Sequence, residues 1–106
     1  MKWRCRDGCV LHIREMGSQH IANSLHMMQR VQRIHLTQGS LSALAYAGIA
    51  PDGAAMAAEG EADRMMDQAL DPASCFNVLL AESEVAREMH ATLKSRGVSF
   101  NVTKWS

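Results

Sequence analysis

The stretch SQHIANSLHMMQRVQRIHL, residues 18–36, decides how this chain folds. Ile21, Leu25 and Met28 recur at intervals of three and four residues and continue into residues 31–32, so they share one face of a helix. Ser18 precedes this pattern and is a typical N-cap residue. The sequence therefore predicts a helix from Ser18 to about residue 36, with a break at Gly39.

Extended segments are expected at both ends of the chain. Lys2–Ile13 predicts a β-hairpin, because Asp7-Gly8 is a two-residue turn signal that would set Cys5 opposite Val10 and Trp3 opposite His12. Val98–Trp105 alternates apolar and polar residues, which predicts a third strand. We expect an α+β fold: a short antiparallel sheet, made of the N-terminal hairpin and the C-terminal strand, that carries about three helices.

The helical middle of the chain is punctuated by glycine and proline. Residues 41–47 predict a short helical piece that ends at Gly48. A second helix is expected from residue 51 to Asp71-Pro72, although Gly53 and Gly60 indicate that it is broken or packs closely on a partner. A last long helix is expected from Ser74 to a C-cap at Gly97.

Length and composition limit the class of protein. With 106 residues the chain forms one domain, residues 1–106, and no apolar run reaches the roughly 18 residues of a membrane span. Eleven basic residues balance eleven acidic ones, which argues against binding duplex nucleic acid. Residues 1–36 nonetheless carry a net charge of +4 (six basic, two acidic) and residues 37–106 a net charge of −4 (five basic, nine acidic). This asymmetry suits either a small anion at the N-terminal part or contact between subunits.

Cysteine usage and the start of the chain indicate the compartment. Met1 leads directly into charged residues, and the three cysteines, Cys5, Cys9 and Cys75, are an odd number, so we expect a reduced, cytoplasmic setting. Cys5 and Cys9 with His12 and His20 form no standard zinc pattern, and free thiols are expected in place of a metal.

One helical stripe combines groups that suit a nucleotide. His20, Asn23, Met27 and Arg30 follow at offsets of three, four and three. Asn23 can bind a base or sugar, and Arg30 offers a planar fork for phosphate. The alternative is that His20 and Asn23 brace the hairpin against the helix.

Three later residues are further candidates for ligand binding. Phe76 is a candidate stacking ring, with a core position as the alternative, and Arg87 and Arg96 are candidate anion-binding cations. Arg87 lies beside Glu84 and Glu88, so surface ion pairs are its alternative role.

The motifs that mark common enzymes are missing from this sequence. It contains no GxGxxG, Walker loop, HExxH, GxSxG or CxxC pattern, so we expect no enzyme and no cofactor. A small nucleotide-cleaving enzyme would need a paired histidine with cysteine or carboxylate, which nothing in the sequence places together.

Residues 3–30 follow a wider pattern: a W, then a DG turn, then an I, and then M-x-x-x-H-(I/L)-x-N-x-(I/L)-x-M-(L/M). The residues that match it are Trp3, Asp7-Gly8, Ile13, Met16, His20-Ile21, Asn23, Leu25 and Met27-Met28. This pattern resembles a set of small phage proteins, and residues 79–82 and 96–98 resemble their C-terminal half. Some phage proteins of this build are Thoeris or CBASS anti-defence sponges for cyclic nucleotide or cyclic ADP-ribose messengers. The resemblance implies a non-catalytic oligomer that holds a messenger between subunits, with His20 and Asn23 matching the motif itself. Residues 41–62 have no counterpart in it.

Two functions from different classes follow as expectations. The first is a phage anti-defence protein that sequesters a nucleotide-derived immune signal in the host cytoplasm without cleaving it, as a homo-oligomer. The second is a non-catalytic interaction module whose methionine-rich helices bind a host or phage protein.

Overall fold

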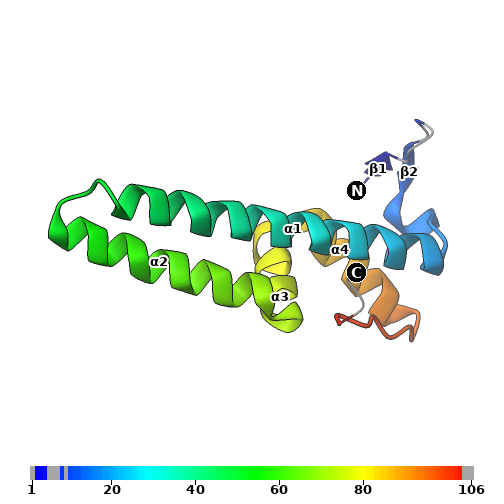
Figure 1. Cartoon of the computed structure of the whole chain (residues 1–106). Helices are drawn as coiled ribbons and strands as arrows, with labels where there is room; N and C mark the ends of the chain where they lie inside the picture. The colour runs from blue at the N-terminus through cyan, green and yellow to red at the C-terminus, as the bar shows by residue number, and fades with distance from the viewer. Residues whose placement is uncertain (1, 5–7, 9, 104–106) are drawn as a thin grey trace.

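One long helix, α1 (Ser18–Ala47), runs along the molecule, and the other three helices pack on it (Figure 1). The computed structural model describes residues 2–4, 8 and 10–103. The remaining elements are, in chain order, β1 (Lys2–Arg4), β2 (Val10–His12), the 3-10 turn η1 (Ile13–Glu15), α2 (Asp52–Leu70), α3 (Pro72–Glu82) and α4 (Glu84–Ser95). Helices with a two-stranded antiparallel hairpin agree with the α+β class, but the helices number four among the described residues, where about three were expected.

The two halves of α1 have different surroundings. The N-terminal half contributes Ile21 and Leu25 to the main core, which α3, α4 and η1 complete with Ile13, Met16, Phe76, Leu79, Ala86, Met89 and Leu93. The C-terminal half packs on α2, which returns antiparallel beside it (Figure 1). The molecule is therefore elongated, with extents of 52 × 27 × 21 Å and a radius of gyration of 16.7 Å, against about 13 Å for a compact domain of this length.

Gly39 does not break α1, contrary to the sequence prediction. A Cβ atom at this position would lie 2.8 Å from Cε of Met65, so the glycine allows α2 to approach closely. The neighbouring Ser40 is buried, and its Oγ donates to the carbonyl oxygen of Ala62 at 2.8 Å. The expected separate helical piece over residues 41–47 is the end of α1, and α2 is likewise unbroken through Gly53 and Gly60.

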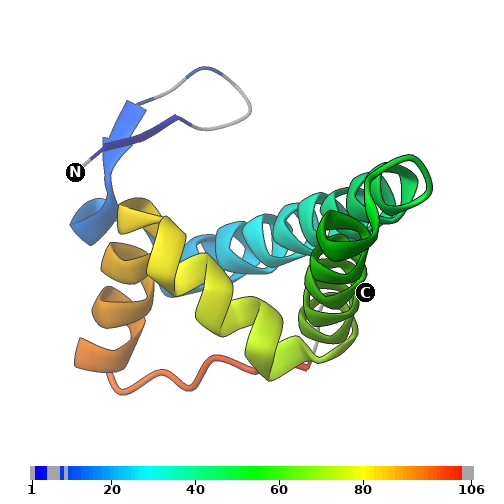
Figure 2. The same cartoon turned by 90° about the vertical axis from the view of Figure 1, so that its left-hand side faces the viewer.

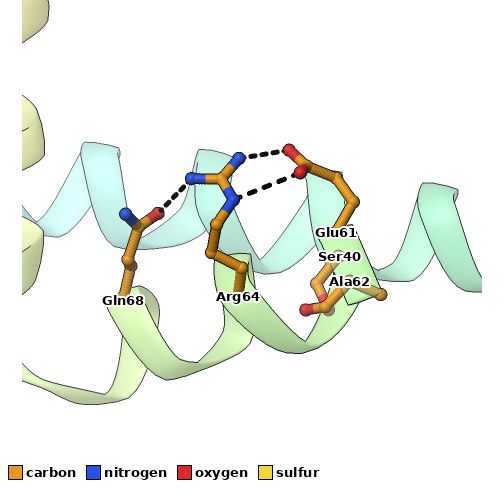
Figure 3. A network of polar contacts seen from close by, with 5 residues as sticks. All are labelled: Ser40, Glu61, Ala62, Arg64 and Gln68. Carbon is orange, nitrogen blue, oxygen red and sulfur yellow. Dashed lines mark hydrogen bonds and ion pairs between the residues drawn. The ribbon is translucent and has the colours of Figure 1, made fainter. Parts of the chain in front are cut away.

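The outer surface of α2 carries a short polar network (Figure 3). Arg64 donates to both carboxylate oxygens of Glu61 and to Gln68. The hydrogen bond from Arg64 lowers the pKa of Glu61 below its ordinary value. Because these groups are exposed, the network adds little to the contact that Ser40 and Ala62 make between the two helices.

The predicted last long helix is two helices. Asp71 caps the start of α3 by accepting from the backbone N–H of Ser74, and Pro72 is the first helical residue, so the break at Asp71-Pro72 is confirmed. The helix ends at Glu82, and Ser83 begins α4 as an N-cap whose Oγ accepts from the backbone N–H of Ala86 at 3.1 Å. Gly97 has a positive φ of 70° after α4, as its predicted role in ending the helix requires.

The start of α1 and the hairpin differ from expectation in detail. The N-cap of α1 is Gly17, and Ser18 is the first residue of the helix. The hairpin pairs Trp3 with Leu11 and Arg4 with Val10, one residue away from the predicted register. This pairing leaves residues 5–9 between the strands, an odd number that a two-residue turn cannot give. Gly8 has a positive φ of 91°. Cys5 lies outside the described residues, and its expected partner Val10 pairs with Arg4.

The predicted third strand is wrong for residues 98–103, and Lys104 and Trp105 lie outside the described part. Residues 98–103 run along the side of α1 away from the hairpin (Figures 1 and 2). The ring of Phe100 lies 4.9 Å from that of Phe76 and 4.4 Å from that of His26. Gln29 Nε2 donates to the carbonyl oxygen of Val102 at 2.7 Å and to that of Pro72 at 3.2 Å. The alternating pattern thus packs onto helices and forms no sheet.

We expect Gly39→Leu to lower the free energy of unfolding by about 1–3 kcal/mol, because the added side chain overpacks the contact with Met65. Gly60→Leu is the matched control: its Cβ meets nothing within 4 Å, so the better helix propensity should raise stability by about 0.8 kcal/mol. Urea denaturation measures both. Equal effects at the two glycines would contradict the close approach at Gly39.

We expect Gln29→Glu to destabilise the fold by about 3–5 kcal/mol at pH 7, because a buried carboxylate would face two carbonyl oxygens. Burial raises the pKa of the new Glu in the folded state, so the folded protein binds more protons than the unfolded one. The loss should therefore shrink as the pH falls through the raised pKa. Denaturation at pH 7 and pH 5 tests this, with Asn77→Asp on an exposed α3 residue as control; a loss that does not depend on pH would contradict it.

Candidate functional site

A groove of about 690 Å³ lies between β1 and the N-terminal half of α1. Its lining residues are Trp3 and Arg4 from β1 and His20, Asn23, Ser24, Met27 and Arg30 from α1. The η1 turn fixes this arrangement, because Ile13 and Met16 are buried in the main core and hold the hairpin next to α1. All four residues of the predicted stripe therefore line one cavity.

The stripe faces outward along α1. His20 is half-buried, Asn23 and Arg30 are exposed, and Met27 is 41% exposed. Asn23 accepts a hydrogen bond from Gln19 Nε2 through its Oδ1 at 2.9 Å. This bond fixes the carbonyl side of the Asn23 amide, so the NH2 side can donate to a ligand.

The charge of the groove is positive. Arg4 and Arg30 contribute two guanidinium groups, and among the described residues that line the groove there is no aspartate or glutamate. Arginine binds phosphate and carboxylate through two parallel N–H groups. Trp3, which is half-buried, adds an aromatic ring of the kind that stacks on planar groups. The groove therefore suits an anion that also carries a flat ring.

Phe76 lies elsewhere, in the main core. It is 4% exposed, and its ring contacts those of Phe100 and His90. Of the two roles considered for Phe76, the structure shows the core position and not the stacking ring.

Arg87 and Arg96 both bind backbone carbonyls. Arg87 Nη1 donates to Leu80 at 2.6 Å and to Ala81 at 3.1 Å, which satisfies carbonyls in the last turn of α3. Arg96 donates to the carbonyls of Arg14 and Met16, both at 2.7 Å, and so joins the end of α4 to η1. These two cations support the backbone away from the groove.

A second recess is lined by His12, Arg14, Glu15 and Glu88 and measures about 270 Å³. Arg14 and Glu88 form an ion pair across it at 3.7 Å. Its two acidic side chains balance its basic ones, so it is a poorer place for an anion than the groove.

The structure offers little for metal or thiol chemistry within its described part. Among residues 2–4, 8 and 10–103 no group of three His, Cys, Asp or Glu side chains is placed to hold a metal. Cys75 is fully buried, donates to the carbonyl of Gln29 at 3.6 Å, and has its pKa raised by burial. A buried thiol with a raised pKa is a poor nucleophile. Cys5 and Cys9, considered above for zinc, lie outside the described residues.

Comparisons with known proteins give this chain no relative. No protein-family model, no curated protein and no solved structure matches it. Across the described residues, no helix has the length and apolar character to cross a membrane.

Trp3 and Arg4 are the groove residues that sequence reasoning missed. Helical spacing connects residues within one helix, and it carries no information about which strand lies beside that helix. The available signal was Trp3 in a short hairpin directly before the helix, since a two-stranded hairpin must lie on another element to be stable.

We expect Arg96→Ala to lower the free energy of unfolding by about 1–3 kcal/mol, because carbonyls of η1 lose a charged donor. Arg30→Ala, which also replaces an exposed arginine, should change stability by less than about 0.5 kcal/mol. Chemical denaturation of the two variants measures the difference. Equal losses would mean that Arg30 also supports the fold.

Proposed function

We propose that this protein binds a phosphate-bearing, nucleotide-derived signalling molecule in the groove and does not cleave it. One observation carries the proposal: Trp3, His20, Asn23 and Met27, which all belong to the pattern that resembles small phage proteins, line a single groove together with Arg4 and Arg30. Stacking on the indole and paired contacts from the guanidinium groups would supply the affinity.

The biological setting in the proposal follows the resemblance of residues 3–30. We propose a phage anti-defence protein that acts as a homo-oligomer in the host cytoplasm and lowers the free concentration of an immune messenger. Sequestration needs affinity and no turnover. This agrees with a groove whose described lining residues present donors and a ring but no paired nucleophile and base.

A second candidate, a protein-interaction module, is favoured by a different observation. Large apolar side chains are exposed on α1, at the turn that follows it and on α2, among them Ile34, Leu41, Ile49 and Met56, the last two at 85% and 74%. Apolar area of this extent on a small chain commonly marks a contact with another protein.

The first test is thermal unfolding against cyclic dinucleotides, cyclic trinucleotides and cyclic ADP-ribose isomers. A true ligand at one hundred times its Kd adds about 2.7 kcal/mol, which is a rise of several degrees in Tm. We expect Arg30→Ala and Arg4→Ala to abolish that rise, while Arg87→Ala, a cation outside the groove, keeps it. The ligand should be recovered intact.

Two outcomes would count against the proposal. A rise in Tm that Arg87→Ala removes and Arg30→Ala preserves would place the ligand outside the groove. No rise with any member of the panel would favour the interaction module.

A further inference from the structure

The face of α1 that points away from α2 carries apolar residues in a regular series. Met27, Val31, Ile34 and Leu41 are between 41% and 57% exposed, and with Gln38 and Ala45 they follow at alternating spacings of four and three. We call these six residues the α1 seam. Their spacing is that of a coiled-coil seam, and continued to Gly48 it extends over three heptads, about 32 Å of helix.

Helix geometry places the α1 seam opposite the contacts with α2. Leu36 and Ser40 are buried against α2, and each lies two residues, about 200° of rotation, beyond a seam position. The helix therefore has apolar residues on two opposite faces, and the described part of the chain covers only one of them. A helix with that pattern is normally buried on both sides.

The chain exposes more area than a compact monomer of its mass. The chain exposes 6682 Å², whereas a compact monomer of 11.7 kDa exposes about 5900 Å². The excess of about 800 Å² equals what each partner contributes to an interface of standard size.

We propose that the α1 seam binds the same seam of a second copy, with the two α1 helices antiparallel. Charge favours this direction: Arg30 and Arg33 lie in one half of a helix that has no acidic residue, and antiparallel packing places them beside the uncharged residues 41–47 of the other copy. A parallel pair would set like charges side by side.

Side-chain size favours the same arrangement. The half of the α1 seam nearest the groove carries Met27, Val31 and Ile34, and the other half ends in Ala45, which Gly48 follows at the same spacing. Antiparallel pairing sets large residues against small ones at both ends, and the contact is the same on both copies, as a two-fold dimer requires. This inference gives the homo-oligomer of the proposed function a surface and a direction, and it does not depend on the ligand.

The test is sedimentation equilibrium of the full chain at about 100 µM, where a dimer with a micromolar Kd is the main species. We expect twice the chain mass of 11.7 kDa for the wild type and a single chain mass for the double variant Ile34→Glu, Leu41→Glu. Leu70→Glu, on an α2 residue that is 70% exposed, is the matched control and should remain a dimer. A monomeric wild type, or a dimer that the seam variant leaves intact, would overturn the proposal.

Direction is tested by a short thiol crosslinker in a chain whose Cys5 and Cys9 are replaced by serine. We expect Val31→Cys chains to link to Ala45→Cys chains and not to each other, because two copies of residue 31 would be about 21 Å apart along an antiparallel pair centred near Gln38. Links between two Val31→Cys chains would overturn the antiparallel arrangement. The double seam variant changes no groove residue, so loss of the dimer and loss of ligand binding are separate results.

Discussion

The side-chain amide of Gln29 connects three segments that are far apart in the sequence. Its Nε2 donates to the carbonyls of Pro72 and Val102, 43 and 73 residues away, and its own backbone carbonyl accepts from the Cys75 thiol. Because the side chain is fully buried, the two carbonyls would lack donors without it, which costs far more than an exposed hydrogen bond contributes. This one residue fixes where α3 starts and where the C-terminal segment lies on α1.

That constraint explains why the two halves of α1 differ. Around Gln29 the helix is enclosed by α3, α4 and the C-terminal segment, and its remaining surface faces the hairpin and the groove. Beyond Leu36 the helix is covered by α2, through the close approach at Gly39 and the hydrogen bond of Ser40. The groove and the α1 seam are thus parts of the same uncovered side of one helix, and Met27 belongs to both.

Local chemistry predicted the elements whose causes are local. The helical face of Ile21 and Leu25, the break at Asp71-Pro72 and the end of the last helix at Gly97 were predicted correctly from neighbouring residues. The helix break predicted at Gly39 was wrong, because this glycine allows close contact with Met65 of another helix. The strand predicted around Phe100 was wrong as well. An extended segment that packs one side on Phe76 and His26 has the same alternation of apolar and polar residues as a half-buried strand.

The candidate site was likewise predicted correctly where its residues share one helix, and wrongly where residue type was the sole criterion. Spacing along one helix identified His20, Asn23, Met27 and Arg30 as a set, while residue type alone selected Phe76, Arg87 and Arg96, which the fold uses elsewhere. A guanidinium is equally suited to a phosphate and to backbone carbonyls, and the sequence cannot distinguish them when the carbonyls lie 80 or more residues away, as for Arg96. Within the described part of the chain no side-chain hydrogen bond or ion pair engages Arg4 or Arg30, so their charge remains available to an anion in the groove.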